Sequence, residues 1–130
     1  MEFTVSTTDR TEVLDVTQEV EGVIPDDIRS GTCTVFVRHT TAGVVVNEAE
    51  RGLIEDVEAF IEQLAPWGAG YRHDAIDDNA AAHLRATLVG ESVTVPVEDG
   101  SLVLGTWQSI LFVESDGPRT RRVQVVVTEA

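Results

Sequence analysis

The sequence contains no lysine. Its nine basic residues are all arginine, against 23 aspartates and glutamates, and the formal net charge is −14. Such a negative surface repels phosphate backbones and lacks the basic patches that release counterions, which argues against nucleic acid as a partner. An acidic excess without lysine is typical of proteins from salt-in halophilic archaea, where molar salt shortens the Debye length to about 3 Å. We therefore expect adaptation to high salt, with an acidic mesophilic protein as the alternative.

Cysteine and long apolar runs are scarce as well. The single Cys33 lies within an alternating apolar stretch, so it cannot form an intramolecular disulfide and is interpreted as a small strand residue. No apolar run approaches the length of a membrane span, and the first residues do not resemble a leader peptide. We expect a cytoplasmic protein without a membrane partner, folded as one domain over residues 1–130, since this length can bury a core.

Apolar periodicity predicts a mixed α/β (α+β) fold. Two-residue alternation predicts a first group of strands at 2–7, 12–16, 32–38 and 44–46, and a second at 92–97, 102–105, 108–114 and 120–128. Helical spacing predicts a long helix from Glu48 to Leu64. Cap and stop residues predict two more: a short helix from Gln18 to about Ile24, capped by Thr17, and one from about Asn79 to Val89, capped by Asp78 or Asn79 and ended by Gly90.

The segment Gly-Thr-Trp-Gln at 105–108 interrupts this alternation with residues that a hydrophobic core does not need. A glycine inside a strand, such as Gly105, usually marks a bulge or the close approach of a ligand or another backbone. Thr106 and Gln108 add hydrogen-bonding groups, and Trp107 adds a large face with one donor. This strand is therefore predicted to form one wall of a pocket.

These residues belong to a longer ordered pattern. Ser-x-x-Val-x-Val-x-x-Gly at 92–100 is followed by Leu-Gly-Thr-Trp-Gln-x-Ile at 104–110, and His-Thr-Thr-Ala-Gly lies at 39–43. The set spans about 80 positions and resembles the YjbQ family of small proteins, also called UPF0047. The resemblance implies a β-sandwich of about seven strands with two to three helices, assembled as a homotrimer. It also implies a thiamine-phosphate synthase activity, which joins a pyrimidine pyrophosphate to a thiazole phosphate.

The resemblance further implies a cleft lined by the shared polar residues. Where relatives often read Asn-Glu-x-x-Asp-Pro, this chain has Arg51 and Gly52 after Asn47 and Glu48, so the acidic residue is missing at position 51. The candidate substrate-binding residues are Thr40, Thr41, Asn47, Asn79, Gly105, Thr106, Trp107, Gln108 and Arg119.

The chain has three histidines, His39, His73 and His83, and each stands beside polar residues. Neutral imidazoles suit Zn²⁺ and similar divalent ions, and three such ligands with an open fourth position are typical of catalytic zinc. We expect the three to converge in one cleft and to bind a divalent metal, with Zn or Mg as candidates. The alternative is that one or two of them hydrogen-bond backbone groups.

Acid/base chemistry and anion binding complete the candidate site. Glu48 lies between an apolar strand and the long helix, so we place it with His39 and His83 as the catalytic set. Asp77 is one of several carboxylates that we interpret as surface charge. Arginines 119, 121 and 122 would hold a small phosphorylated metabolite if they face the cleft, and would form a surface ion-pair network otherwise. The sequence leaves three functions open: a synthase-like enzyme, a non-catalytic trimeric metal- or metabolite-binding protein, and a metal-dependent hydrolase.

Overall fold

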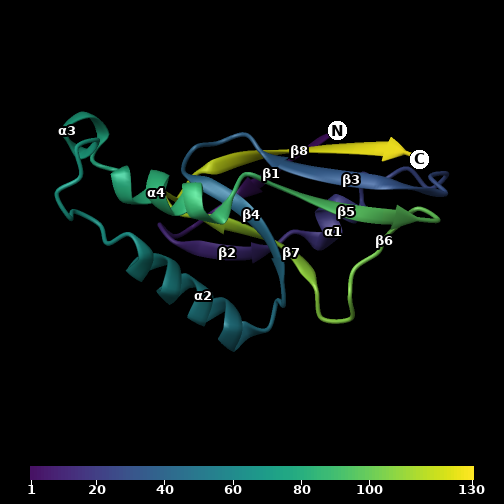
Figure 1. Ribbon diagram of the computed structural model, residues 1–130, viewed down its shortest axis with the longest axis horizontal. Helices are drawn as coiled ribbons and strands as arrows, with labels where there is room; N and C mark the ends of the chain where they lie inside the picture. Colours follow the sequence, from purple (N-terminus) through teal and green to yellow (C-terminus); the bar gives the residue numbers. More distant parts are fainter.

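The computed structural model describes all residues from 1 to 130 and contains eight strands and four helices (Figure 1). The strands are β1 (Glu2–Ser6), β2 (Glu12–Asp15), β3 (Ser30–Val37), β4 (Ala42–Asn47), β5 (Ser92–Glu98), β6 (Ser101–Leu102), β7 (Ser109–Glu114) and β8 (Thr120–Glu129). The helices are α1 (Thr17–Glu21), α2 (Arg51–Leu64), α3 (Asp74–Asp77) and α4 (Ala80–Val89). The mixed fold class predicted from the sequence is confirmed. None of the helices is long and apolar enough to cross a membrane.

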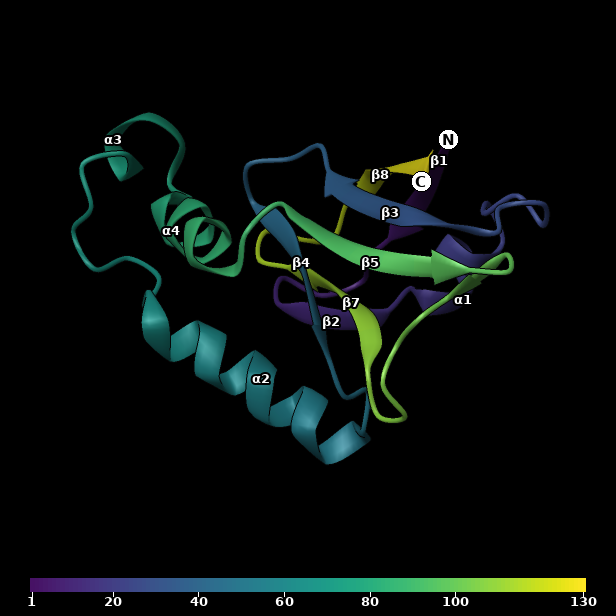
Figure 2. The same cartoon turned by 45° about the vertical axis from the view of Figure 1, so that its right-hand side comes forward.

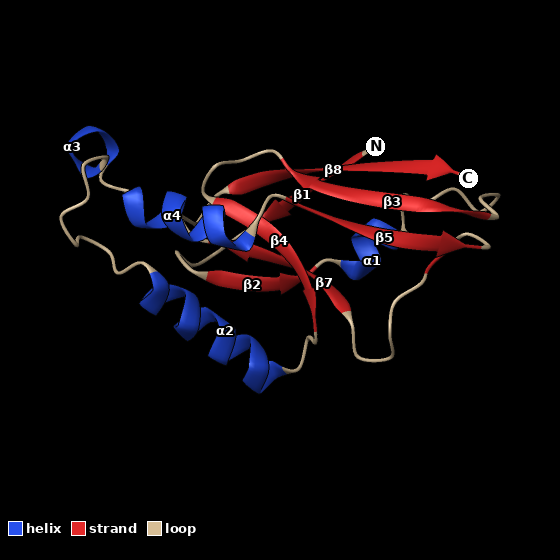
Figure 3. Ribbon diagram, in the orientation of Figure 1, coloured by secondary structure: helices blue, strands red, loops and turns tan.

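Two antiparallel sheets and a helical layer make up the architecture. One sheet has five strands in the order β1-β8-β3-β5-β6, and the other has three in the order β2-β7-β4. Inward side chains such as Cys33 and Val35 on β3 meet Ile110 and Phe112 on β7, and all four are fully buried. Helices α2 and α4 lie on the side of the smaller sheet that faces away from the larger one (Figures 2 and 3). The two sheets therefore enclose the main core, and a small second core lies beneath α2.

The β-strand periodicity explains why this core forms. Along β3, buried residues alternate with more exposed ones, and Cys33 is buried with no disulfide, as its interpretation as a strand residue requires. In the second core, Ile61 of α2 packs against Val13, Leu111 and Val113 of the smaller sheet. Burial of each large apolar side chain is worth about 1.5–3 kcal/mol, so the two clusters fix the sheets and α2 relative to one another.

Two helix starts differ from the sequence expectation. Helix α2 begins at Arg51 rather than Glu48, because the Glu50 carboxylate accepts hydrogen bonds from the backbone N–H groups of Gly52 and Leu53. Thr17 does not cap α1: its hydroxyl accepts a bond from the N–H of Ile110, at 2.9 Å, and so ties the helix to β7. The cap expected at Thr17 is therefore wrong, and the cap at Glu50 was not predicted.

The segment before α4 also differs from the expected loop. It contains the short helix α3, and the Asp74 carboxylate accepts a bond from the N–H of Ala80 at 2.9 Å, which leaves Asn79 without a capping bond. Helix α4 then packs closely on β4. A Cβ at Gly43 would collide with the carbonyl oxygen of Gly90, so a glycine is required where the end of α4 meets the strand. This contact positions the face of α4 that reaches the site.

The segment Gly105–Gln108 is an exposed turn between β6 and β7 and not part of a strand. The Gln108 side chain accepts a bond from the N–H of Gly105 at 2.8 Å, and the Gln108 N–H donates to the Gly105 carbonyl at 3.0 Å. These two local bonds close the turn, so the chain leaves the sheet at the segment where alternation is interrupted. We call residues 105–108 the tryptophan turn.

Candidate functional site

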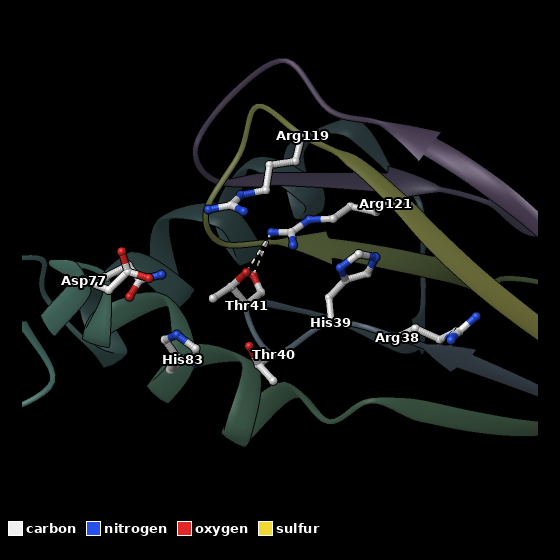
Figure 4. A pocket seen from close by; sticks show the side chains of 9 residues that line it. Arg38, His39, Thr40, Thr41, Asp77, His83, Arg119 and Arg121 are labelled. Carbon is white, nitrogen blue, oxygen red and sulfur yellow. Dashed lines mark hydrogen bonds between the residues drawn. The ribbon is translucent and has the colours of Figure 1, made fainter.

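A polar pocket opens where the chain passes from one sheet to the other. Strand β3 ends at Val37 in the five-stranded sheet, and residues 38–41 lead into β4 of the smaller sheet, beside the connection from β7 to β8 (Figure 4). The pocket has a volume of about 330 Å³ and no hydrophobic lining residue. We call it the arginine pocket, and its lining residues are Arg38, His39, Thr40, Thr41, Asp77, Asn79, His83, Arg119 and Arg121.

Charge is distributed unevenly around this pocket. Three of the nine arginines line it, and Arg122 is next to one of them. The neighbouring acids are Glu114, Asp116 and Glu2, which form ion pairs with these arginines, and Asp77 in the lining. Four cations therefore face four acids here, whereas the chain as a whole carries −14. An anion meets less repulsion at this corner than elsewhere on the protein.

A buried ion pair forms the floor of the site. Glu114 is fully buried and Arg121 is 2% exposed. Nε of Arg121 donates to Oε1 of Glu114 at 2.8 Å, and its Nη2 donates both to Oε2 of Glu114 and to the hydroxyl of Thr41, the latter at 2.9 Å. The bonds at Nε and Nη2 hold the guanidinium in place. Nη1 takes part in none of them, so this terminal nitrogen remains for a ligand.

Further donors keep the Glu114 carboxylate ionised. Burial alone would raise its pKa, but hydrogen bonds from Arg121, from the N–H of Asp116 and from the hydroxyl of Thr7 outweigh burial, so the pKa is lowered. The Thr7 hydroxyl lies 2.8 Å from Oε1, and the N–H of Asp116 lies 3.0 Å from Oε2. The pair therefore remains charged and joins residues that are far apart in the sequence.

Arg119 forms the outer edge of the pocket. Its Nε donates to the carbonyl of Asp116 and its Nη2 to the Asp116 carboxylate, each at 2.9 Å, while its side chain is 53% exposed. The same carboxylate accepts a bond from Nδ2 of Asn79 at 3.1 Å. The Oδ1 atom of Asn79 is buried without a partner, the kind of group that a ligand donor satisfies.

His39 is set up as a neutral hydrogen-bond donor. Its Nε2 accepts a bond from the backbone N–H of Arg122 at 2.8 Å, so the ring proton of the neutral form is on Nδ1. Burial lowers the pKa of this ring, and the positive charge of Arg121 lowers it further. The ring therefore offers an N–H to a ligand, and its single lone pair is already used by the protein.

The three histidines do not fit one metal ion in this arrangement. His39 and His83 line the arginine pocket, whereas His73 lies behind His83, with the two ring centres 4.7 Å apart in an edge-to-face contact. The structure contains no group of three or more His, Cys, Asp or Glu side chains that could hold a metal ion. A divalent metal remains a prediction from the sequence, and no step below depends on it.

Comparison with known proteins agrees with this architecture. Residues 1–130 match the family described as "UPF0047 protein YjbQ-like". The chain belongs to the YjbQ/UPF0047 family. It is 56% identical over 125 residues to a UPF0047 protein of Archaeoglobus fulgidus, covering 96% of this chain and 98% of the relative. It is 42% identical over 120 residues to the UPF0047 protein YugU of Bacillus subtilis, covering 90% and 89% of the two chains.

Solved structures of the family have the same fold. Hypothetical protein APE1520 of Aeropyrum pernix K1 superposes with a TM-score of 0.95 at 47% identity, covering 100% of this chain and 98% of that one. A YbjQ-like protein of unknown function from Sulfolobus solfataricus P2 gives a TM-score of 0.95 at 42% identity, covering 100% and 96%. The resemblance inferred from the sequence motifs is thereby confirmed over the whole chain.

The family motifs do not all meet in one cleft of a single chain. Glu48, Thr106 and Trp107 line a separate pocket of about 270 Å³ next to the tryptophan turn. In the ladder between β4 and β7, Asn47 pairs with Ser109 at that end, whereas Ala42 pairs with Glu114 beside the arginine pocket. Five residues of a strand separate the two ends by about 17 Å.

The expectation of one shared pocket is therefore corrected. The arginine pocket receives His39, Thr40, Thr41, Asn79, His83 and Arg119 of the expected set, together with Arg121 of the arginine cluster, and it excludes Asn47, Glu48, His73 and Gly105–Gln108. Residues 105–108 were expected to form a strand along the wall of this cleft, but they form a turn, and Thr106 and Trp107 line the separate pocket beside Glu48. Arg51, where relatives often carry an acid, is 94% exposed and pairs only with Glu55 on the next turn of α2.

Two lining residues were not among the expected site residues. Asp77 had been interpreted as surface charge and Arg38 had not been singled out, yet both line the arginine pocket. Asp77 ends the four-residue helix α3, which is too short to give a periodic signal. Arg38 could have been identified from the sequence, because it stands next to His39 and directly follows a buried strand.

Proposed function

We propose that the arginine pocket binds the phosphate or pyrophosphate group of a small metabolite, and that the protein is an enzyme resembling secondary thiamine-phosphate synthase. The observation that carries this proposal is a pocket with an entirely polar lining that includes three of nine arginines, in a chain with a net charge of −14. If the arginines served only to neutralise acidic side chains, we would expect them to be spread over the whole surface. Their concentration around one cavity supports a ligand of negative charge.

Four donors are available to such an anion. They are Nη1 of Arg119, Nη1 of Arg121, the Nδ1–H of His39 and the hydroxyl of Thr40, none of which is used in a hydrogen bond within the protein. Arg121 is fixed by Glu114 and Thr41 and needs little rearrangement on binding. Preorganised donors of this kind stabilise developing charge more effectively than mobile ones.

These donors suit the bond change of the synthase reaction. A ring nitrogen of the thiazole phosphate forms a bond to the methylene carbon of the pyrimidine, while the bond from that carbon to pyrophosphate oxygen breaks. The electron pair leaves with pyrophosphate, so negative charge develops on its oxygens. Bonds from Arg119, Arg121 and His39 would strengthen as this charge grows. His83, in the same lining as Asp77, is the candidate to donate a proton to the departing group.

The alternative proposal is a non-catalytic metabolite-binding protein. It is favoured by the position of Glu48, the carboxylate expected to act in catalysis, which lies in the pocket next to the tryptophan turn. The arginine pocket then contains a single carboxylate in its lining, that of Asp77. A metal-dependent hydrolase has less support, because the histidines do not form a three-ligand set.

With either function we propose that the protein assembles as a homotrimer. Light scattering in molar KCl tests this, and a monomeric mass at all protein concentrations would reject it.

The synthase proposal is tested by product formation from the two phosphorylated precursors in molar KCl with a divalent ion. We expect His83→Ala to lower the rate by about a hundredfold, the effect of one acid/base group. Leu88→Ala is the matched control, because Leu88 is on the same helix and 66% exposed but outside the pocket. If the wild type binds pyrophosphate but forms no product, or if His83→Ala retains full activity, the binding-protein alternative replaces the synthase.

A further inference from the structure

A second cavity adjoins the arginine pocket and has a different character. It measures about 280 Å³ and is lined by Tyr71, Arg72, His73, Ala80, His83 and Leu84. His83 belongs to both linings, so the two cavities meet at this ring. Half of the residues of the second cavity are hydrophobic, whereas the arginine pocket has none. The combined site therefore has one end suited to an anion and another suited to an apolar group.

We propose that this second cavity, which we call the ring subsite, binds a planar aromatic ring carried by the phosphorylated ligand. The proposal rests on the proposed function, because it assigns the non-phosphate part of the same ligand. Tyr71 and the imidazole of His83 provide ring faces and edges, and Ala80 and Leu84 provide aliphatic contact. Aromatic groups gain from such surroundings through burial and through offset or edge-to-face contacts.

Local structure explains how these side chains come together. Ala80, His83 and Leu84 have the spacing i, i+3 and i+4, which places them on one face of α4. The chain from Tyr71 to His73 precedes α3 and closes the other side. His73 meets His83 edge to face at an interplanar angle of 77°, so the two imidazoles pack together where the second cavity borders the arginine pocket.

One polar atom at this corner has no partner in the protein. Nε2 of His73 is buried and makes no hydrogen bond. Buried polar groups are normally satisfied, and an exception at the lining of a cavity points to a ligand group. A heteroatom on the ring of the ligand would fill this role, as donor or acceptor according to the tautomer of His73.

Cavity size supports one ring and not a larger group. Pockets for small molecules usually measure about 300–1,000 Å³, and each of the two cavities is near the lower limit. Joined through His83, they would accommodate a phosphorylated compound with one ring. Trp107, the other aromatic considered for stacking, is 73% exposed and belongs to the separate pocket next to Glu48.

The test compares three probes in molar KCl: inorganic phosphate for the anion, benzyl alcohol for the ring, and benzyl phosphate for both. Because the chain has only three histidines, their Hε1 ring protons give three NMR signals, assigned with His→Gln variants. We expect benzyl alcohol to shift the signals of His73 and His83, and phosphate to shift those of His39 and His83 but not that of His73. Benzyl phosphate should bind about tenfold more tightly than inorganic phosphate, because the ring is removed from water.

Leu84→Ala should reduce this tenfold preference to about threefold or less, with no change in the affinity for inorganic phosphate. Leu88→Ala, one turn further along α4 and outside the ring subsite, should leave the preference unchanged. Equal affinity for benzyl phosphate and phosphate would overturn the ring subsite and retain anion binding. Binding of benzyl alcohol without any binding of phosphate would overturn the proposed function and retain the ring subsite. If no probe binds, both fail.

Discussion

The arginine pocket and the tryptophan turn both carry motifs of the YjbQ/UPF0047 family, and the protein holds them in opposite ways. The Arg121 and Glu114 pair on one side is buried and bonded to Thr7 and Thr41, residues distant in the sequence. The tryptophan turn is closed by two bonds within four residues, and Trp107 is 73% exposed. Both segments carry family motifs, so the motifs alone do not distinguish them. Burial and long-range hydrogen bonds do: they hold the arginine pocket in a fixed geometry within one chain, whereas only local bonds hold the tryptophan turn.

The strongest way to test this contrast is to remove one cation from the floor of the pocket. Arg121→Met leaves the Glu114 carboxylate buried without its counter-ion, so we expect the free energy of unfolding to fall by about 3–5 kcal/mol. Trp107→Ala, at an exposed position, should change it by no more than about 0.5 kcal/mol. Denaturant unfolding in molar KCl measures both values.

If Arg121→Met does not fold, the double variant Arg121→Met, Glu114→Gln decides the question. It removes the unpaired charge and keeps an acceptor for the Thr7 hydroxyl, so it should recover most of the lost stability. A cost below about 1 kcal/mol for Arg121→Met, or equal costs for Arg121→Met and Trp107→Ala, would contradict the proposed difference between the two regions.

A second comparison concerns anion binding at the outer edge of the pocket. Arg119→Gln removes one charge-assisted donor, so we expect the affinity for pyrophosphate to fall by about tenfold. Arg51→Gln is the matched control: it removes the same charge from an exposed position on α2 and should lower the affinity by less than about twofold. Calorimetric titration distinguishes them, and equal losses would mean that only net charge matters.

The state of the buried pair should appear in the pH dependence of stability. Because the pKa of Glu114 is lowered in the folded protein, the unfolded chain takes up a proton first as the pH falls. The stability contributed by this group is therefore fully present above its ordinary pKa of 4.5 and is lost as the pH falls through the lower folded value. The difference in unfolding free energy between wild type and Glu114→Gln should be constant from pH 7 to about 5 and shrink below that. A constant difference down to pH 3 would contradict this.

The smallest expected effect is on the titration of His39. Burial and the nearby Arg121 lower the pKa of this ring, so its NMR signal should titrate with a midpoint below the ordinary value of 6.5. By linkage, the corresponding stability is present above 6.5 and declines as the pH falls through the lower folded value. The Arg121→Met, Glu114→Gln variant, if folded, removes the lowering effect of Arg121 and the smaller raising effect of Glu114, so the midpoint should move upward only slightly. A wild-type midpoint at or above 6.5 would be inconsistent with the neutral donor assigned to His39.

Local pattern was sufficient for most of the fold. Alternation identified the strands around Cys33 and Phe112, helical spacing identified α2, and the Gly90 stop marked the end of α4, because these signals depend on neighbouring residues. The turn at 105–108 was missed because Gly105 was interpreted as a bulge or close approach within a strand, whereas its N–H donates to the Gln108 side chain and closes a turn. Likewise, Glu50 takes the capping role because its carboxylate accepts bonds from the N–H groups of Gly52 and Leu53, two and three residues further along the chain.

The site was only partly predictable, for a different reason. The motif around His39 and the cluster containing Arg119 are each visible in the sequence, but their meeting depends on how two sheets are joined. Glu48 looked equally well placed, since it also follows an apolar strand. It lies at the opposite end of β4 from the arginine pocket. Periodicity predicts that a strand is present, but it does not predict which end of the strand lies next to a given pocket.

The most direct test of the central claim is a titration of the wild-type protein with pyrophosphate in molar KCl, observed by NMR. The ring protons of His39 and His83 report on the arginine pocket, and the indole N–H of Trp107, assigned with Trp107→Phe, reports on the tryptophan turn. We predict saturable shifts of both histidine signals with the Trp107 signal unchanged. Absence of any histidine shift, or a shift confined to Trp107, would contradict an anion site at the arginine pocket.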